Sequence, residues 1–438
     1  MSKRVGYWIA MAACALSGGM QAGAQVSLAT VVDLAMRNSP AVKIANANVQ
    51  HAEAGLQESK DVYIPSFALS AGIGPPSYGF PQGQPTLYDV TAQSLLFSPA
   101  QRDYIRAARA ALQSAQLNLK DSTEQVAMDT VLAYLQLDHD LQLIAAQQEE
   151  KTFADKLVDI ERDRLLAGVD SRIAVTHAEL TSAQVDARRL QLEDDVNLMR
   201  EKLGHYTGLP ASGFVTDAKS IPPPPEIVSD TNYVSRVMDA NAGVQAAYAN
   251  AHSKELLFTG DKKQNYRPQF AFGAQYSRYA EFNNYQEFYL HFQQNNFGAE
   301  VQITFPIFDA NKRAKARESA ADAAKAGAEA DQAMDQADEQ VSAMHHNIEE
   351  LKAQQRIAEL QGELAQEDLE SIQAQLKNGS GSSNAAPITP KEEQLAHIQE
   401  RQRYQDVLDA SFQVLRVELS LMRSLGGVAN WAHVRPQP

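Results

Sequence analysis

The segment FGAEVQITF, residues 297 to 305, decides the fold. Its residues alternate strictly between an apolar and a polar set: Phe297, Ala299, Val301, Ile303 and Phe305 against Gly298, Glu300, Gln302 and Thr304. A period of two predicts a strand with one apolar and one polar face. Similar alternation occurs at 66–73, 88–93 and 269–276. The chain is therefore expected to hold two pairs of strands, within about 65–98 and about 268–308.

Helical patterns surround each pair of strands. A helix is expected from Leu28 to Asp61, and a very long one follows from about Ser98 to Ala167. The second pair of strands is followed by an equally long helix from about Ala310 to Asn378. Each long helix ends at a glycine, Gly168 or Gly379, and shorter helices return over 173–205 and 391–425. At 1.5 Å per residue the long helices span roughly 100 Å, so they need neighbours packed along their length.

The two halves are repeats of one unit. Asn38 and Pro65 superpose on Asn241 and Pro268 at an offset of 203 residues, and Gly168 meets Gly379 at an offset of 211. The expected first repeat is 25–220 and the second is 233–425. A proline-rich linker, 221–232, separates them, and a tail, 426–438, follows.

The first 24 residues read as a secretory signal peptide. Lys3 and Arg4 precede the apolar run 5–16, and Ala22-Gly23-Ala24 is a typical cleavage site. An uncleaved anchor is the alternative reading. Cys14, the one cysteine, lies within the apolar run, and whether it accepts a lipid stays open.

The charge balance excludes one class of partner. The chain has 39 basic and 54 acidic residues and a formal charge of −15. Nucleic-acid binding needs clustered Lys and Arg, so no nucleic-acid partner is expected. After residue 24 no apolar run approaches the ~20 residues of a spanning helix. The chain is then either soluble or embedded in a membrane through strands.

Two features favour strands in lipid over a soluble sheet. Their length of about 9–12 residues fits a tilted spanning strand, and aromatic residues gather at their ends. The polar face would then line a lumen, with these residues: Asp89, Thr91, Gln93, Glu300, Gln302 and Thr304. Four strands cannot close a barrel, and open edges cannot remain in lipid. Three copies would supply twelve strands, continued by the long helices as a second tube.

At this point the sequence resembles the TolC-like outer-membrane efflux proteins. The resemblance rests on motifs that keep their order in the duplicated frame: Leu34-Ala35 with Asn38-Ser39-Pro40, Ile64-Pro65-Ser66-Phe67, Phe305-Pro306-Ile307-Phe308-Asp309 with Arg313, and Leu421-Met422-Arg423-Ser424-Leu425-Gly426. It implies a homotrimeric exit duct in the outer membrane of a Gram-negative bacterium. The duct would continue as a periplasmic helical barrel and serve an efflux or type I secretion system, with an inner-membrane pump and a periplasmic adaptor as partners.

The resemblance also places the functional residues at the far ends of the hairpins. The tips expected to meet the adaptor are Gly168, Val169, Asp170, Ser171, Gly379 and Ser380. Relatives often carry aspartates after the second glycine, as acidic rings at the channel entrance. Here Glu392 and Glu393 are the nearest acids, with Asp170 on the first tip. Carboxylates are also favourable at a helix start, so the two glutamates could cap the returning helix, a role compatible with the first.

No constellation indicates catalysis, a cofactor or a metal. His345 and His346 are adjacent, so they point to different faces of a helix and make poor joint ligands. The chain is therefore not expected to be an enzyme. The alternative that keeps the long helices without a channel is a secreted or periplasmic structural coiled-coil protein.

Overall fold

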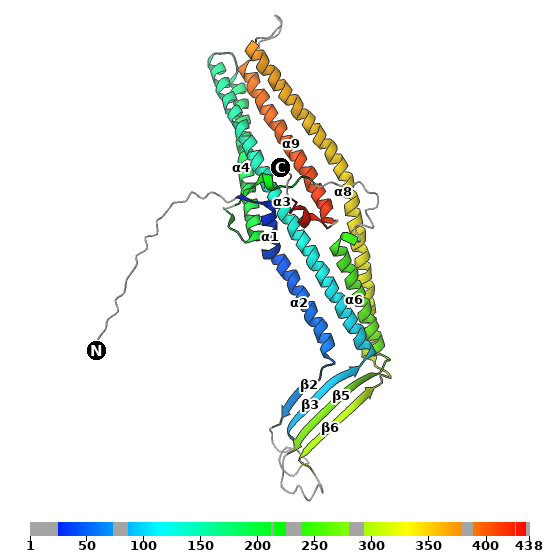
Figure 1. The fold of residues 1–438 in the computed structure, drawn as a ribbon. Coiled ribbons are helices and arrows are strands. Elements are labelled where there is room, and N and C mark those ends of the chain that lie inside the picture. Colours follow the sequence, from blue (N-terminus) through cyan, green and yellow to red (C-terminus); the bar gives the residue numbers. More distant parts are fainter. Residues whose placement is uncertain are drawn as a thin grey trace, which may run out of the picture.

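The computed structural model describes residues 25–72, 86–211, 214–224, 239–279, 293–378, 389–424 and 426–434. The predicted signal peptide lies outside these residues. The chain forms a long, narrow body, with a four-stranded sheet at one end and two helical hairpins at the other (Figure 1). The fold class is the predicted combination of strands and very long helices.

The helices of the first half run along the body. They are α1 (Leu28–Asn38), α2 (Pro40–Asp61), α3 (Pro99–Leu166) and α4 (Arg172–Thr207). The single helix predicted from 28 to 61 is wrong, because Ser39 leaves helical geometry at ψ 130°. Pro40 follows at the first position of α2, where its missing N–H costs nothing. The two predicted long helices are confirmed within a few residues.

The second half repeats this order. It contains α6 (Ala242–Gln264), α8 (Ala310–Asn378), α9 (Pro390–Ser424) and the short α10 (Val428–Trp431). α3 packs against α4 on one side and α9 on the other, and α9 packs against α8. The hairpin region is thus a layer in the order α4, α3, α9, α8 (Figure 1).

The sheet contains β2 (Ser66–Ala71), β3 (Thr86–Phe97), β5 (Gln269–Tyr279) and β6 (Asn295–Thr304). Their spatial order is β2-β3-β5-β6, and every neighbouring pair is antiparallel. Within the described residues, β2 and β6 each have one edge without a partner strand. Such an edge presents unpaired backbone N–H and C=O groups, which can pair with another strand.

A collar midway along the body joins the two halves. The short strands β1 (Gln25–Val26) and β4 (Val215–Thr216) pair in parallel, and the 3-10 turn η2 (Ala218–Ser220) follows. Tyr134 of α3 lies beneath them: its hydroxyl donates to Val26 O at 2.8 Å and accepts from the Asp217 N–H at 2.7 Å. Around it lies the main apolar core, formed by α1, α3, α4, α9 and α10.

The C-terminal segment belongs to this core. Trp431 is buried, and its indole N–H donates to Pro223 O at 3.0 Å. Pro223 lies in the proline-rich linker, of which residues 225–232 are outside the described part. The sequence did not predict a helix after residue 425, yet α10 fastens the end of the chain to the linker and α1.

Candidate functional site

The first hairpin tip is a tight turn between α3 and α4. Gly168 has φ +72°, a conformation that glycine adopts without cost. The Val169 N–H donates to Arg164 O at 2.9 Å, which satisfies a carbonyl at the end of α3. This geometry leaves Val169 and Leu166 exposed at the extreme end of the molecule. Ser171 occupies the cap position before α4 without a side-chain capping bond.

An ionic cluster lies directly behind that tip. Asp170 accepts from Arg164 Nε at 2.5 Å and lies 4.0 Å from Lys391 Nζ of α9. The Arg164 hydrogen bond holds the pKa of Asp170 below its usual value. Lys391 Nζ also lies 2.5 Å from Glu161 Oε1, a carboxylate whose side chain is only 3% exposed. Lys391 therefore fastens the start of α9 to the end of α3, which joins the two hairpins at their tips.

The two predicted entrance glutamates have different surroundings. Glu392 Oε2 accepts from the Thr389 N–H at 2.7 Å, while Glu392 N–H donates to Thr389 O at 3.0 Å. The side-chain bond is the carboxylate half of a capping box. Glu393 is half-buried on the same first turn. Glu392 is therefore a helix cap, the role that the sequence left as an alternative. Gly379 and Ser380 lie outside the described residues.

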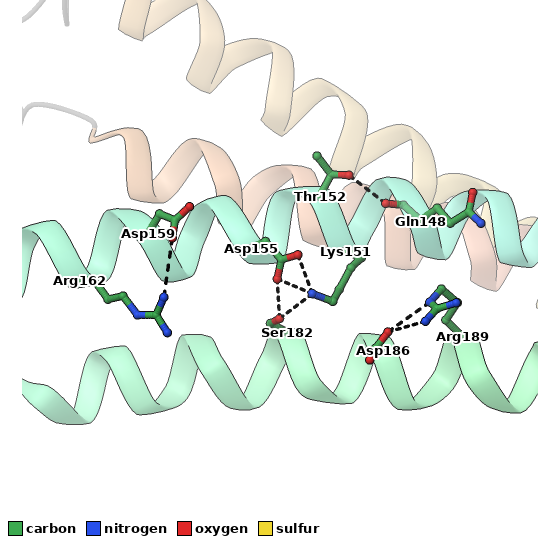
Figure 2. Close-up of polar contacts among 9 residues, drawn as sticks. All are labelled: Gln148, Lys151, Thr152, Asp155, Asp159, Arg162, Ser182, Asp186 and Arg189. Atoms are coloured by element: carbon green, nitrogen blue, oxygen red, sulfur yellow. Dashed lines mark hydrogen bonds and ion pairs between the residues drawn. The ribbon is translucent and has the colours of Figure 1, made fainter.

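Ion pairs and hydrogen bonds line the contact between α3 and α4, most of the ion pairs lying within one helix (Figure 2). Lys151 pairs with Asp155, and Ser182 of α4 donates to the same carboxylate at 2.7 Å. Near the tip, Arg162 lies 2.7 Å from Glu179 of α4. Arg189 pairs within α4, with Asp186 and Glu193. These groups are largely exposed, so each pair contributes little to stability.

The contact between α3 and α9 is polar over much of its length. Glu150 is 2% exposed, and its two oxygens accept from the amides of Gln402 and Gln405, each at 2.8 Å. Gln147 in turn donates to Gln405 Oε1 at 2.6 Å. Sequence reasoning missed this seam, because a carboxylate and glutamines more than 250 residues apart in the sequence give no signal until the packing is known.

The six polar strand residues predicted to face a lumen share one face of the sheet. Gln93 of β3 is paired with Gly273 of β5, which is paired with Glu300 of β6. Side chains at paired positions point to the same side, and alternation places Asp89, Thr91, Gln302 and Thr304 there too. Asp89 accepts from Gln275 at 2.8 Å and from Ser277 at 2.6 Å, so polar contacts cross the strands on this face. The lumen itself stays a prediction.

The opposite face of the sheet is apolar and exposed. Phe67 and Leu69 of β2 are more than 70% exposed. Val301 and Ile303 of β6 are each at least half exposed. A soluble sheet would bury these side chains under another layer. In this chain no such layer covers them among the described residues (Figure 1).

Two kinds of feature are absent from the described part of the chain. No helix there is both long and apolar enough to cross a bilayer. Within the same residues, no three His, Cys, Asp or Glu side chains are grouped so that they could hold a metal ion.

Comparison with known proteins agrees with this geometry. Residues 31–209 match the family described as outer membrane efflux protein. No curated protein sequence matches the chain.

Solved structures match over most of the chain. VceC, an outer membrane protein of Vibrio cholerae, is 17% identical with a TM-score of 0.73, covering 91% of this chain and 96% of its own. The CmeC channel of Campylobacter jejuni is 12% identical with a TM-score of 0.73, covering 97% and 94%. The open state of the MtrE channel of Neisseria gonorrhoeae is 13% identical with a TM-score of 0.67, covering 94% and 91%. At these identities the likeness is one of fold.

The fold is that of solved outer membrane channels, with a sheet at one end and long helical hairpins at the other. The predicted resemblance to the TolC-like outer membrane efflux proteins is confirmed by the family match over residues 31–209 and by the fold shared with solved outer membrane channels. Of these matched structures, CmeC and MtrE are described as outer membrane channels.

Proposed function

We propose that three copies of this chain form a passive exit duct through the outer membrane. The observation that carries the proposal is the four-stranded sheet, which has two open edges and one exposed apolar face. In lipid the edges must pair, because no water is present to satisfy their backbone groups. Pairing β6 of one copy with β2 of the next closes the sheet. Two copies give eight strands and an interior filled by side chains, whereas three give twelve strands and a lumen.

The helical layer also supports assembly from several copies. Its two outer helices are α4 and α8 (Figure 1). Each carries exposed apolar side chains: Ile173, Leu180, Leu190 and Leu198 on α4, and Ile357, Leu360 and Leu364 on α8. Packing α4 of one copy against α8 of the next would bury both sets and continue the barrel as a helical tube. The alternative, a structural coiled-coil protein without a channel, gives no reason for the apolar sheet face.

The proposed partners are a periplasmic adaptor at the tips and an inner-membrane pump that delivers the substrate. The first tip offers an apolar contact, Leu166 and Val169, at the end of the molecule farthest from the sheet. With Gly168, Asp170 and Ser171 it forms the proposed adaptor surface. Gly379 and Ser380 of the second tip belong to the same proposal on sequence grounds alone.

Current through planar lipid bilayers tests the duct. Purified protein added to one side should give discrete conductance steps of uniform size. Val169→Asp should leave these steps unchanged but abolish export in cells that carry the pump and adaptor. Protein that binds the bilayer without conductance steps would contradict the proposal.

A further inference from the structure

Two histidine–phenylalanine stacks join α3 and α9, and they are reciprocal. His139 of α3 stacks on Phe412 of α9, with ring centroids 4.6 Å apart and planes inclined by 23°. Closer to the tips, His397 of α9 stacks on Phe153 of α3, at 4.2 Å and 8°. The buried Glu150 and its glutamine partners lie between them in sequence on both helices. The seam between the hairpins is therefore bounded by two titratable rings.

His139, in the stack farther from the tips, lies next to two carboxylates. His139 Nδ1 lies 3.2 Å from Asp140 Oδ1, and its Nε2 lies 3.0 Å from Asp409 Oδ1 of α9. Burial opposes protonation of His139, but these two carboxylates outweigh it and raise the pKa to about 9. The His139 ring is thus a charged imidazolium between two aspartates at neutral pH.

His397, in the stack nearer the tips, has no such pair of carboxylates on its ring nitrogens within the described part of the chain. His397 Nε2 lies 3.2 Å from Gln373 Nε2 of α8, so the neutral ring accepts from this amide. Burial is the largest effect on the pKa of His397 and lowers it. Glu393 and Glu400 raise this pKa, Lys156 and Arg401 lower it, and the net shift is downward.

The surroundings of the stack between His397 and Phe153 disfavour a charge on His397. Lys156 Nζ of α3 lies 5.5 Å from the centroid of the Phe153 ring that His397 stacks on. Phe153 packs on an apolar cluster that includes Leu157 and Ile398. If His397 gained a proton at Nε2, two donors would face each other, and the Gln373 amide would have to turn.

We propose that His397 makes the contact between the hairpins acid-responsive: its protonation loosens α9 from α3 and α8 near the tips, while His139 keeps α9 on α3 farther from the tips. The proposal rests on the proposed function, because an opening at the tips matters only in a duct. Acidification of the periplasm would then widen the entrance. The response would begin below the ordinary histidine pKa of 6.5, since the neutral ring is the form that fits the site.

Single-channel recording tests the proposal with the whole protein. The tip-side solution is taken from pH 7.5 to pH 5.0, and the open time of the wild type should rise. His397→Phe keeps the stack but cannot gain a proton, so its open time should not change with pH. His177→Gln, an exposed histidine on α4, is the matched control and should respond as the wild type does.

The outcomes separate this inference from the function on which it rests. Absence of current at every pH would overturn the duct itself. Current that does not change with pH in the wild type, or that responds equally in His397→Phe, would overturn the role of His397 alone.

A distance measurement guards against a variant that folds poorly. Nitroxide labels at Asp159 and Leu395 report the distance between α3 and α9 near the His397 stack. Labels at Ala145 and Asp406 report that distance near the His139 stack, and each pair occupies exposed positions of α3 and α9. Cys14 is replaced by alanine, and labelled chains are diluted with unlabelled ones. Only the labels at Asp159 and Leu395 should move apart below pH 6.5. Equal change in both pairs, or in neither, would overturn the proposal.

Discussion

Lys391 at the start of α9 lies 2.5 Å from Glu161 near the end of α3, and the glutamate side chain is 3% exposed. Among the described residues, this pair is the closest ionic link between the two hairpins at their tips. It joins the helix start at Thr389 to the turn at Gly168, so it bears on how firmly the entrance is closed.

Lys391→Gln should loosen that entrance. The substitution leaves a buried carboxylate without its cation, at a cost of about 1–3 kcal/mol. We expect a larger resting conductance in bilayers. Lys377→Gln removes the same charge from an exposed position on α8 and should have no effect. Equal resting conductance in both variants would show that the pair does not restrain the tips.

Charge should be harmful on one face of β6 and tolerated on the other. Val301 and Ile303 are paired with Phe272 and Phe270 on the apolar face, while Gln302 lies on the polar face with Ala271. Val301→Lys or Ile303→Lys should cost about 2–4 kcal/mol near the bilayer midplane and reduce insertion. Gln302→Lys should insert normally and alter conductance. If all three variants insert equally well, the alternation does not separate lipid from lumen.

Glu392 and Glu393 should make the periplasmic mouth prefer cations. Three copies would place several carboxylates around a narrow opening, where low-dielectric walls focus their field. Glu392→Gln keeps the capping geometry, since glutamine also serves in a capping box, so it removes charge without removing the cap. The reversal potential in a salt gradient should lose its cation preference in the Glu392→Gln and Glu393→Gln double variant.

An unchanged reversal potential would show that the glutamates act only at the helix start. Asp170 would not then be a strong substitute, because Arg164 and Lys391 already compensate its charge.

Stability should fall in alkali through His139. The folded pKa of about 9 lies above the ordinary 6.5, so the contribution of its ion pairs is complete below pH 6.5 and is lost as pH rises through 9. The temperature of thermal unfolding should therefore drop between pH 6.5 and 10 in the wild type. The drop should be smaller in His139→Gln and unchanged in His51→Gln, an exposed histidine on α2. Identical curves for all three proteins would contradict this assignment.

The sequence could predict the strands and long helices because their signals are local. Alternation at 297–305 and the prolines and glycines at 65, 168, 268 and 379 mark where each element starts or ends. The break at Ser39 was missed although Pro40 is visible, because proline at a first helical position reads equally well inside a longer helical pattern.

The candidate site could be predicted only in part. Asp170, Glu392 and Glu393 were identified as tip residues, but the cations that surround Asp170 come from α3 and α9, far apart in the sequence. The two histidine–phenylalanine stacks join residues more than 240 positions apart. Such contacts depend on how the two repeats pack, and periodicity carries no information about that.

The mass of the detergent-solubilised particle tests the central claim most directly. One chain offers four strands with two open edges, and closure by copies of itself requires three. Native mass spectrometry of protein extracted from outer membranes should show three chains per particle, stable in mild detergent. A monodisperse single chain that retains its strand signal would contradict the account, because an open four-stranded sheet cannot line a duct.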